Sequence, residues 1–278
     1  MSDKEQDGMI SCDDDNNEDT YVYSVEYAED GQYLTGPDDK KIGPFMSIYL
    51  EDMSLMEKKD FIFRYIDKES GLIGYMDQDG NAMTDAIFTE ASKVADGPAI
   101  VKEKTGGAYY IDRKSFKRIS EDFLSGYEFE HQGQYARVQF EDGKYGIINE
   151  IGEVVFKGAE KINPIPMVFC ETTAIVDGHA TGLSLPLDEG LMVNVLFQLE
   201  EECSDISDYY MGLVAVFTTK NGKQGVVDVR ENILVPAEYK DIECREVLFG
   251  EDAHIEHNME IICQKEDGTR EVIMRAVR

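Results

Sequence analysis

The side chains best suited to bind a metal ion lie near the C-terminus. Cys244, His254, His257 and Cys263 follow one another with the spacing C-x9-H-x2-H-x5-C. Zinc prefers thiolates and imidazoles, but structural zinc sites use tighter spacings, and residues three apart on a strand point to opposite faces. The sequence therefore favours a polar loop, Gly250 to Asn258, between two strands, and predicts no metal site.

Nucleophilic catalysis has few candidate residues. Cys170 and His179 could form a thiolate–imidazolium pair, but Cys170 follows Val168-Phe169 in a stretch typical of a buried core. Ser184 lacks the second glycine of a nucleophile elbow. The chain contains no Gly-Lys-Ser/Thr loop and no Gly-x-Gly-x-x-Gly motif, which excludes nucleotide binding by those two routes. We therefore predict no catalytic residue and no cofactor.

Carboxylates are the remaining candidates for chemistry, because 57 Asp and Glu place many acids near one another. A carboxylate-based hydrolase with a cleft between repeats is the alternative function. It requires a concave pocket with converging acids and at least one carboxyl whose pKa is strongly raised. The stretch Asp77 to Asn81 resembles part of a calcium loop, but Tyr75 stands where the first ligand would be, so a turn is predicted.

Composition restricts the class of partner. The 278 residues carry 27 Lys and Arg against 57 Asp and Glu, a formal charge of −30, and 42% of them are hydrophobic. This is a globular composition whose charge disfavours nucleic acid and anionic membranes as partners. The first residues, Met1 to Glu5, do not resemble a signal segment, and the five Cys form no disulfide framework. A cytoplasmic location is expected.

The negative charge is concentrated in two regions. Residues 1–30 hold eleven acids against Lys4, and we expect residues 1–20 to be a flexible acidic tail. From Ile162 to Thr219 there are nine acids and no Lys or Arg. Residues 102–118, with six basic and two acidic side chains, form a basic island of net charge +4. Acidic blocks of this kind are commonly solvated surface with no specific partner. The more specific interpretation is that they bind a basic surface of another protein.

A group of acids within the second region is the predicted partner-binding surface. It consists of Glu200, Glu201, Glu202, Asp205 and Asp208. An acidic face of this kind steers association with a basic protein.

Turn chemistry organises the elements that must position these acids. Asp142-Gly143, Asn221-Gly222 and Asp267-Gly268 each separate two β-rich stretches, which predicts two-residue hairpins with φ > 0 at both turn residues. After the second strand, an Asp or Asn is followed three or four residues on by Gly or Asn, as in Asp228 to Asn232. This pattern predicts a second turn closed by a left-handed Gly or Asn. The repeating unit is therefore a three-stranded antiparallel meander.

The spacing of the strand-end Asp and Asn residues gives the repeat. These residues are 77, 112, 149 and 228, which indicates a period of about 35 to 40 residues. The interval from 149 to 228 must hold one divergent or inserted unit at 162–210, with Thr181 to Leu185 as its middle strand. We predict a single domain, 21–278, of about five or six degenerate units.

These motifs resemble a known family. Lys144-Tyr145-Gly146-Ile147-Ile148-Asn149, Lys223 to Asp228 and Ile73 to Asp77 are similar to the "KWGYID" core of bacterial WG-repeat (KWG-type) proteins. Ile233 to Ile242 resembles the family's "GKxVIPxxYDxI" continuation. Tyr145, Gln224 and Ile73 occupy the position of the signature Trp. The resemblance covers most of residues 40–275 and implies a repeated β-structure that serves as an interaction scaffold.

The fold expected is all-β and mainly antiparallel, with three- to four-stranded meanders stacked as a β-solenoid or closed into a propeller-like ring. Little helix is expected, and Met53 to Asp60 is its best candidate. The leading function is a non-enzymatic scaffold that binds a basic protein, as an inhibitor or immunity protein would. A third possibility is self-assembly, in which the basic island meets an acidic region of a second copy.

Overall fold

The chain forms antiparallel β-structure throughout the part that the structure describes. The computed structural model describes residues 9–12, 21–36, 38–50, 61–94, 97–130, 132–166, 170–186, 192–249 and 256–276. Within these ranges every regular element is a strand and no helix occurs, which confirms the all-β prediction. The helix candidate Met53 to Asp60 lies outside the described residues.

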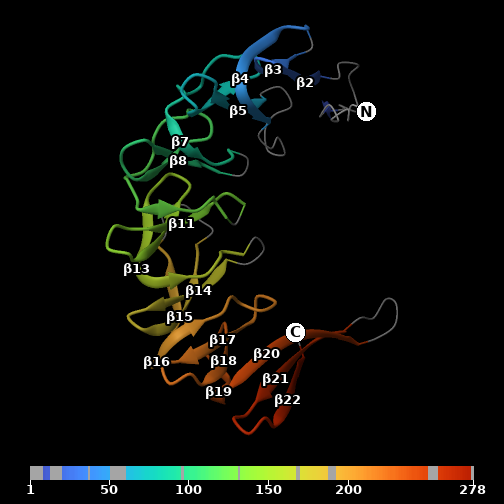
Figure 1. The fold of residues 1–278 in the computed structure, drawn as a ribbon. Coiled ribbons are helices and arrows are strands. Elements are labelled where there is room, and N and C mark those ends of the chain that lie inside the picture. The colour runs from blue at the N-terminus through green and yellow to red at the C-terminus, as the bar shows by residue number, and fades with distance from the viewer. Residues whose placement is uncertain are drawn as a thin grey trace. The chain divides into compact units, whose positions relative to one another are not determined.

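The chain divides into two compact units. The first is Met1–Phe129 with Glu150–Gly152, and the second is Glu130–Asn149 with Glu153–Arg278. In the first unit, strands β1 to β9 follow one another in a nine-stranded antiparallel sheet (Figure 1). The strands of this sheet are β1 Met9–Cys12, β2 Tyr21–Ala28, β3 Gly31–Thr35, β4 Lys41–Leu50, β5 Ile62–Asp67, β6 Ile73–Asp77, β7 Phe88–Ala91, β8 Ala99–Glu103 and β9 Ala108–Ile111. The unit also contains β10 Ser125–Gly126, which is not part of this sheet. Strand β1 lies inside the predicted acidic tail 1–20 and pairs with β2.

The second unit continues the same order. Strands β11 to β19 pair in sequence, and β20, β21 and β22 form a separate three-stranded sheet (Figure 1). Its strands are β11 Tyr135–Gln139, β12 Tyr145–Asn149, β13 Val154–Ile162, β14 Glu171–Val176, β15 His179–Ser184, β16 Asn194–Ile206, β17 Val214–Thr219, β18 Gln224–Asp228, β19 Ile233–Tyr239, β20 Asp241–Phe249, β21 Glu256–Gln264 and β22 Arg270–Ala276.

Neighbouring meanders share a strand. The third strand of one meander pairs with its own middle strand through its first half and with the next meander's first strand through its second half. In β13, Ala159 pairs with Tyr145 of β12 and also with Val176 of β14. We call such a third strand a shared strand. The meander β14–β15–β16 fills the predicted divergent region, and β15 (His179–Ser184) confirms the middle strand expected at Thr181 to Leu185.

Each of several middle strands carries a glycine beneath an aromatic ring. A Cβ built on Gly182 of β15 would lie 2.4 Å from the ring of Phe197, and one on Gly225 of β18 would lie 2.5 Å from the ring of Phe217. Gly146 of β12 lies in the same way under Phe140. Aromatic side chains cover strand glycines because the missing Cβ leaves room for a ring. Phe197 and Phe217 lie on the neighbouring strand, directly opposite Gly182 and Gly225, and their rings fill the space above these glycines.

The hairpin turns differ from the prediction in length. In the turn of Asp142-Gly143, Phe140 N donates to Lys144 O, and Gly143 N donates to Phe140 O, so the loop has three residues. Only Gly143 has a positive φ (82°). The turns at Asn221-Gly222 and Asp267-Gly268 follow the same pattern. The two-residue prediction was wrong because these loops are type I turns followed by one left-handed Gly, whereas a two-residue type I′ turn needs two positive φ angles.

In the meanders whose middle strand ends at Asp77 or Asp228, this carboxylate holds the second turn. Asp228 Oδ1 accepts from the amides of Arg230 and Asn232, and Asp228 Oδ2 accepts from the Asn232 side chain. Asp77 makes the equivalent bonds, which supports the turn predicted there. The positive φ after Asp228 belongs to Glu231 (66°) and not to Asn232, because Asn232 serves as a donor to the carboxylate.

We expect Asp67→Asn to flatten the acid side of the stability profile. Hydrogen bonds from the amide and hydroxyl of Ser70 hold the pKa of Asp67 below its usual value. A folded pKa below the unfolded one adds stability above the unfolded pKa, and this is lost as pH falls through the folded pKa. Unfolding midpoints of both proteins between pH 6 and pH 2 measure the difference. Asn keeps one side-chain oxygen that accepts hydrogen bonds and does not titrate, so parallel pH profiles would contradict the prediction.

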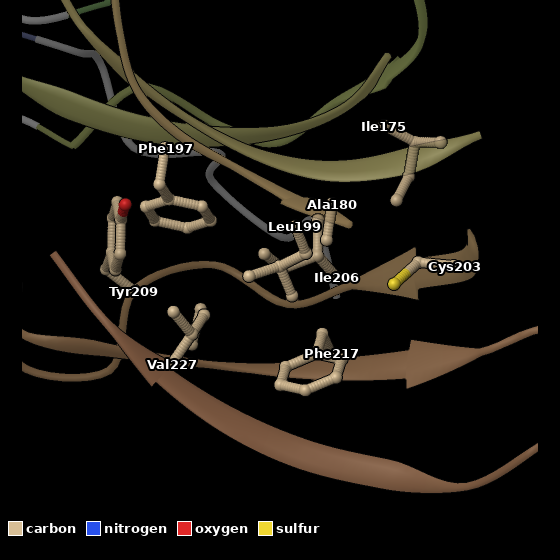
Figure 2. Close-up of a cluster of buried hydrophobic side chains, with 10 residues drawn as sticks. Ile175, Ala180, Phe197, Leu199, Cys203, Ile206, Tyr209, Phe217 and Val227 are labelled. Carbon is tan, nitrogen blue, oxygen red and sulfur yellow. The ribbon is translucent and has the colours of Figure 1, made fainter. Parts of the chain in front are cut away.

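The core of the second unit lies between meanders. Figure 2 shows one buried cluster, in which Phe197, Leu199 and Cys203 of β16 pack with Phe217 of β17 and Val227 of β18. The remaining members are Ile175, Ala180, Ile206, Tyr209 and Ala215. The cluster joins two consecutive meanders because β16 belongs to both of them. Burial of apolar surface between meanders is what makes each unit depend on its neighbour.

We expect Tyr209→Phe to raise the unfolding midpoint of the second unit. Tyr209 is 8% exposed, and its hydroxyl has no hydrogen-bond partner among the described residues. Removing a buried, unsatisfied hydroxyl adds about 1 kcal/mol to the free energy of unfolding. Thermal or denaturant unfolding measures the change. Tyr135→Phe is the matched control, because the Tyr135 hydroxyl donates to Pro186 O and its removal is expected to destabilise.

Candidate binding groove

Strand β16 carries the predicted acidic surface and is unusually irregular. Thr181 of β15 pairs with Gln198, and His179 pairs with Glu202, so Ala180 alone faces the three residues 199 to 201. The result is a β-bulge, the kind of irregularity that bends a strand and redirects its side chains. His179 Nδ1 lies 2.9 Å from Leu199 O and 3.2 Å from Glu201 O, which fixes the bulged backbone. The bulge therefore sets the positions of Glu200 and Glu201.

A groove of about 360 Å³ lies beside this bulge, entirely within the second unit. Its floor is apolar, because Leu199 and Phe217 belong to the buried cluster of Figure 2. Three carboxylates line it as well, from Glu200 and Glu201 of β16 and from Glu231 in the turn before β19. The other lining residues are Gln198, Ile233, Pro236 and Ala237. The groove thus combines an apolar floor with an acidic rim.

The rim carboxylates carry uncompensated charge. Among the described residues, no ion pair involves Glu200, Glu201 or Glu231. By contrast, Glu202 pairs with Lys220 at 2.8 Å, and this ion pair lowers the pKa of Glu202. Charges that lack a local counterion are those most available to a partner.

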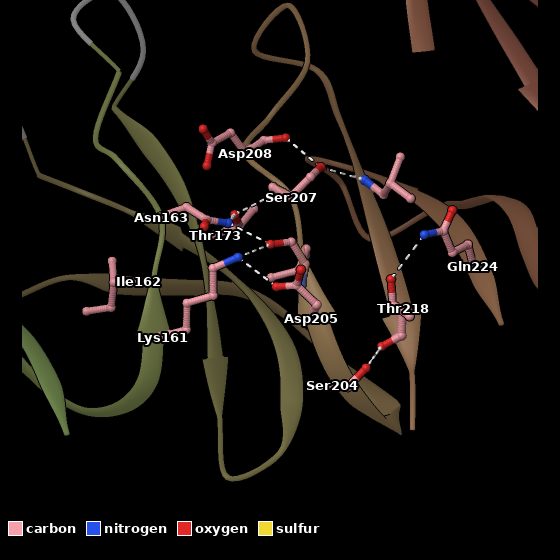
Figure 3. Close-up of polar contacts among 12 residues, drawn as sticks. Lys161, Ile162, Asn163, Thr173, Ser204, Asp205, Ser207, Asp208, Thr218 and Gln224 are labelled. Atoms are coloured by element: carbon pink, nitrogen blue, oxygen red, sulfur yellow. Dashed lines mark hydrogen bonds and ion pairs between the residues drawn. The ribbon is translucent and has the colours of Figure 1, made fainter. Parts of the chain in front are cut away.

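Lys161 and Lys220 flank the region 162–219, which contains no Lys or Arg, and both side chains contact acids of that region. Lys161 Nζ lies 2.6 Å from Asp205 Oδ1 and also donates to Ile206 O at 3.0 Å (Figure 3). Lys220 pairs with Glu202. Two of the five predicted acids are therefore engaged within the protein. Such exposed pairs are weak, about 0–1 kcal/mol, so a partner can exchange with them at little cost.

Asp208 lies apart from the groove. Partial burial raises the pKa of its carboxyl, the positive charges of Lys161 and Arg137 oppose that rise, and Glu130 and Asp205 add to it. Figure 3 shows Asp208 next to Ser207, whose hydroxyl donates to Asp208 O. Of the five predicted acids, the structure brings only Glu200 and Glu201 to the groove.

A polar network secures the end of β16. Asn163 Nδ2 donates to Thr173 Oγ1 at 2.7 Å and to Ile206 O at 2.8 Å, and Thr173 Oγ1 donates to Ser207 O at 2.7 Å (Figure 3). Asn163 and Thr173 are both buried. These bonds satisfy backbone carbonyls where β16 leaves one meander for the next. The groove is thus built on a strand that is fixed at both the bulge and the end.

Sequence reasoning missed Glu231 and the apolar floor. Glu231 lies thirty positions after Glu201 and reaches the groove because β19 follows β18 and β17 in the sheet. Its left-handed conformation (φ 66°) follows from the turn that Asp228 opens. The sequence predicts the turn that contains Glu231, but it does not predict that this turn lies close to β16.

A carboxylate hydrolase needs a pocket where acids gather and, in the same pocket, a carboxyl with a raised pKa. In this structure the two features occur at different places. Among the described carboxyls, the one whose pKa is raised is Asp208, and it does not line the groove where three acids gather. The proposed Cys170–His179 pair is also excluded, since Glu171 pairs with Ser184 and Val176 pairs with His179 at the opposite ends of one hairpin. Among the described residues, no group of three His, Cys, Asp or Glu could hold a metal ion.

The thiols of the predicted metal cluster lie on neighbouring strands. Cys244 of β20 pairs with Ile261, and Cys263 of β21 pairs with Ile242. Burial raises the pKa of the Cys244 thiol to about 11. The side chains of His254 and His257 lie outside the part that the structure describes. In the described ranges, no helix is long and apolar enough to cross a membrane.

Comparison with known proteins identifies no family. No family model matches the chain, and no curated protein matches its sequence. Solved structures that resemble it include Hsv2p of Kluyveromyces lactis, with a TM-score of 0.35, 10% identity and coverage of 93% of this chain and 94% of that one. BamB from Moraxella catarrhalis gives a TM-score of 0.31 at 11% identity over 90% and 95% of the two chains. The computationally designed Ika8 protein gives 0.34 at 13% over 94% and 82%. Likenesses of this size carry no argument about function.

Proposed function

We propose that this protein is a non-enzymatic β-repeat scaffold that binds a basic protein through the acidic groove. The observation that carries the proposal is the groove itself, where Glu200, Glu201 and Glu231 surround the apolar floor of Leu199 and Phe217 without ion-pair partners in the described residues. An inhibitor or immunity protein that covers the basic surface of its target is the most specific form of this function.

The chemistry of the groove favours Lys and Arg side chains with an apolar residue between them. Carboxylates on the rim attract the cationic groups, while Ile233, a lining residue that is 48% exposed, offers apolar surface to a side chain that leaves water. The long-range field of an acidic chain of charge −30 raises the association rate with a basic partner by about 10–10³-fold at low salt. Complementary charge thus raises the association rate and the selectivity, and apolar contact in the groove slows dissociation.

The WG-repeat resemblance and the cytoplasmic location remain predictions that accompany this proposal. The resemblance supports it because repeated β-meanders offer strands and turns as binding surfaces. Self-assembly is the second candidate. In the basic island, Arg118 pairs with Asp122, and Lys102 lies 3.7 Å from Glu90. Arg113, Lys114 and Lys117 make no ion pair in the described residues and are available to another copy.

Charge reversal in the groove tests the proposal. The triple variant Glu200→Lys, Glu201→Lys and Glu231→Lys is expected to lose at least ten-fold of the wild-type capture of basic proteins from host lysate at low salt. Its loss of affinity between 50 and 300 mM salt should be shallower, because fewer charges contribute. The matched control is Glu69→Lys, Glu121→Lys and Glu141→Lys, which changes net charge equally on exposed sites outside the groove. Equal losses in both triples would show that net charge acts and that the groove does not.

A further inference from the structure

The strand that lines the groove has a free backbone edge. Residues 194 to 202 of β16 pair with β15, and only residues 203 to 206 pair with β17. In the described ranges no strand pairs with the other edge of residues 194 to 201, whereas Glu202 O accepts from the amide of Lys220. An unpaired edge presents a row of N–H and C=O groups that another extended chain can pair with. The groove opens beside the end of this edge, at Gln198 to Glu201.

The edge has some of the usual protections of edge strands and lacks others. Proteins block free edges with Lys, Pro, inward charges or β-bulges. This stretch has a bulge opposite Ala180 and a second irregularity opposite Gly182 and Leu183. The first half of the shared strand β13 contains a protective residue, Lys157. The free stretch of β16 contains no Lys, Arg or Pro. It carries instead two exposed apolar side chains, Val195 (58% exposed) and Leu196 (38% exposed).

Apolar and acidic features follow one another along this edge. Val195 and Leu196 come first, and Glu200 and Glu201 follow at the bulge beside the groove. An extended chain that runs along the edge therefore meets apolar side chains at one end and carboxylates at the other. Its backbone can pair with β16 while its side chains reach the groove floor at Leu199 and Phe217.

We infer that the basic partner docks by adding an extended segment as a strand to the free edge of β16. The segment carries apolar residues beside Val195 and Leu196, one apolar side chain over the groove floor, and Lys or Arg against the rim carboxylates. This inference rests on the proposed function and specifies how the groove is occupied. Charge complementarity with the rim selects a partner of this chemistry over a second acidic surface.

A peptide probe with a methylated backbone tests strand addition separately from charge attraction. The probe is an acetylated, amidated peptide of alternating Lys and Val, measured with the full chain by calorimetry. Two analogues carry N-methyl groups on the Lys residues or on the Val residues. Because alternate residues of a strand donate to opposite sides, one analogue should bind at least ten-fold more weakly and the other nearly as the parent does. Amide exchange at residues 195 to 201 should slow on binding.

Protein variants locate the edge. Val195→Lys with Leu196→Lys places protective charges on the β16 edge and should weaken binding at least ten-fold. Val272→Lys with Ile151→Lys adds the same two charges at exposed positions outside the groove, so this double variant is the matched control and should leave binding unchanged. Protection of residues 270 to 276 instead of 195 to 201 would overturn the assignment to β16.

The outcomes distinguish this inference from the function on which it rests. If both methylated analogues bind equally while the groove triple variant abolishes binding, the acidic groove stands and strand addition is wrong. If the parent peptide gives no protection of residues 195 to 201 at millimolar concentration, strand addition is also wrong. If those amides become protected as the protein itself is concentrated, and sedimentation shows dimers, the occupant is a second copy and the basic partner is excluded from this edge.

Discussion

Gly182→Ala is expected to lower the free energy of unfolding of the second unit by about 2–3 kcal/mol. A Cβ at this position would lie 2.4 Å from the Phe197 ring and 2.7 Å from the Tyr209 hydroxyl. Phe197 is 2% exposed and packed inside the cluster of Figure 2, so its ring has no free space to move into. Urea unfolding monitored by circular dichroism measures the change.

A second substitution identifies the cause of this loss. Phe197→Leu alone is expected to cost about 1–1.5 kcal/mol, since it removes buried volume. In the double variant with Gly182→Ala, the smaller side chain makes room for the new methyl group. The combined loss should then be smaller than the sum of the two by at least 1 kcal/mol. Ser184→Ala on the same strand is the control and should change stability by less than about 0.5 kcal/mol. Strict additivity would show that the ring does not cause the strain.

Glu130→Ala is expected to be comparably damaging, at about 3 kcal/mol. Arg137 donates to both Glu130 oxygens, at 2.8 and 3.1 Å, and its side chain is only 12% exposed. Glu130 also accepts from the amide of Ile165. Loss of the carboxylate removes the Glu130 ion pair of a nearly buried guanidinium, and the amide of Ile165 loses its acceptor. The unfolding free energy in urea measures this loss.

The apolar replacement of the pair gives the contrasting result. Glu130→Leu with Arg137→Met removes both charges and keeps similar volume, so the loss should be well below that of Glu130→Ala. If the double variant is as unstable as the single one, then the hydrogen bonds of Glu130 to Ile165 and of Arg137 to Ile162 dominate over the ion pair.

The sequence was informative about where the strands and turns lie, and much less so about the lengths of the turns and the way one meander continues into the next. Turn chemistry located the meanders, including β15, because Asp, Asn and Gly are needed where the chain reverses. It misjudged the length of the hairpin loops, since Asp-Gly and Asn-Gly suit both a type I′ turn and a type I turn followed by a left-handed Gly. The shared strands were not foreseen. Their switch from one ladder to the next depends on register shifts, such as the one beside Ala159, where the extra residue is Gly158 with φ 112°. A single glycine in a strand does not tell a shared strand from an ordinary bulge.

Only part of the candidate site could be predicted from the sequence. The charge block around Glu200 and Glu201 could be located by counting, but its compensation by Lys161 and Lys220 could not. The groove depends on a three-dimensional arrangement, since the bulge of β16 faces Glu231 and β19 across β17 and β18. Sequence distance conceals such neighbours wherever several strands intervene.

The order of the strands also bears on how the chain folds during its synthesis. Within each sheet the strands pair in the order of the sequence. Pairing of this kind closes short loops, so we expect fast folding for a β-protein of this length. A meander that leaves the ribosome can form at once, and the second half of its shared strand then serves as a template for the first strand of the next. Growth in this manner is directional, with each completed meander recruiting its successor.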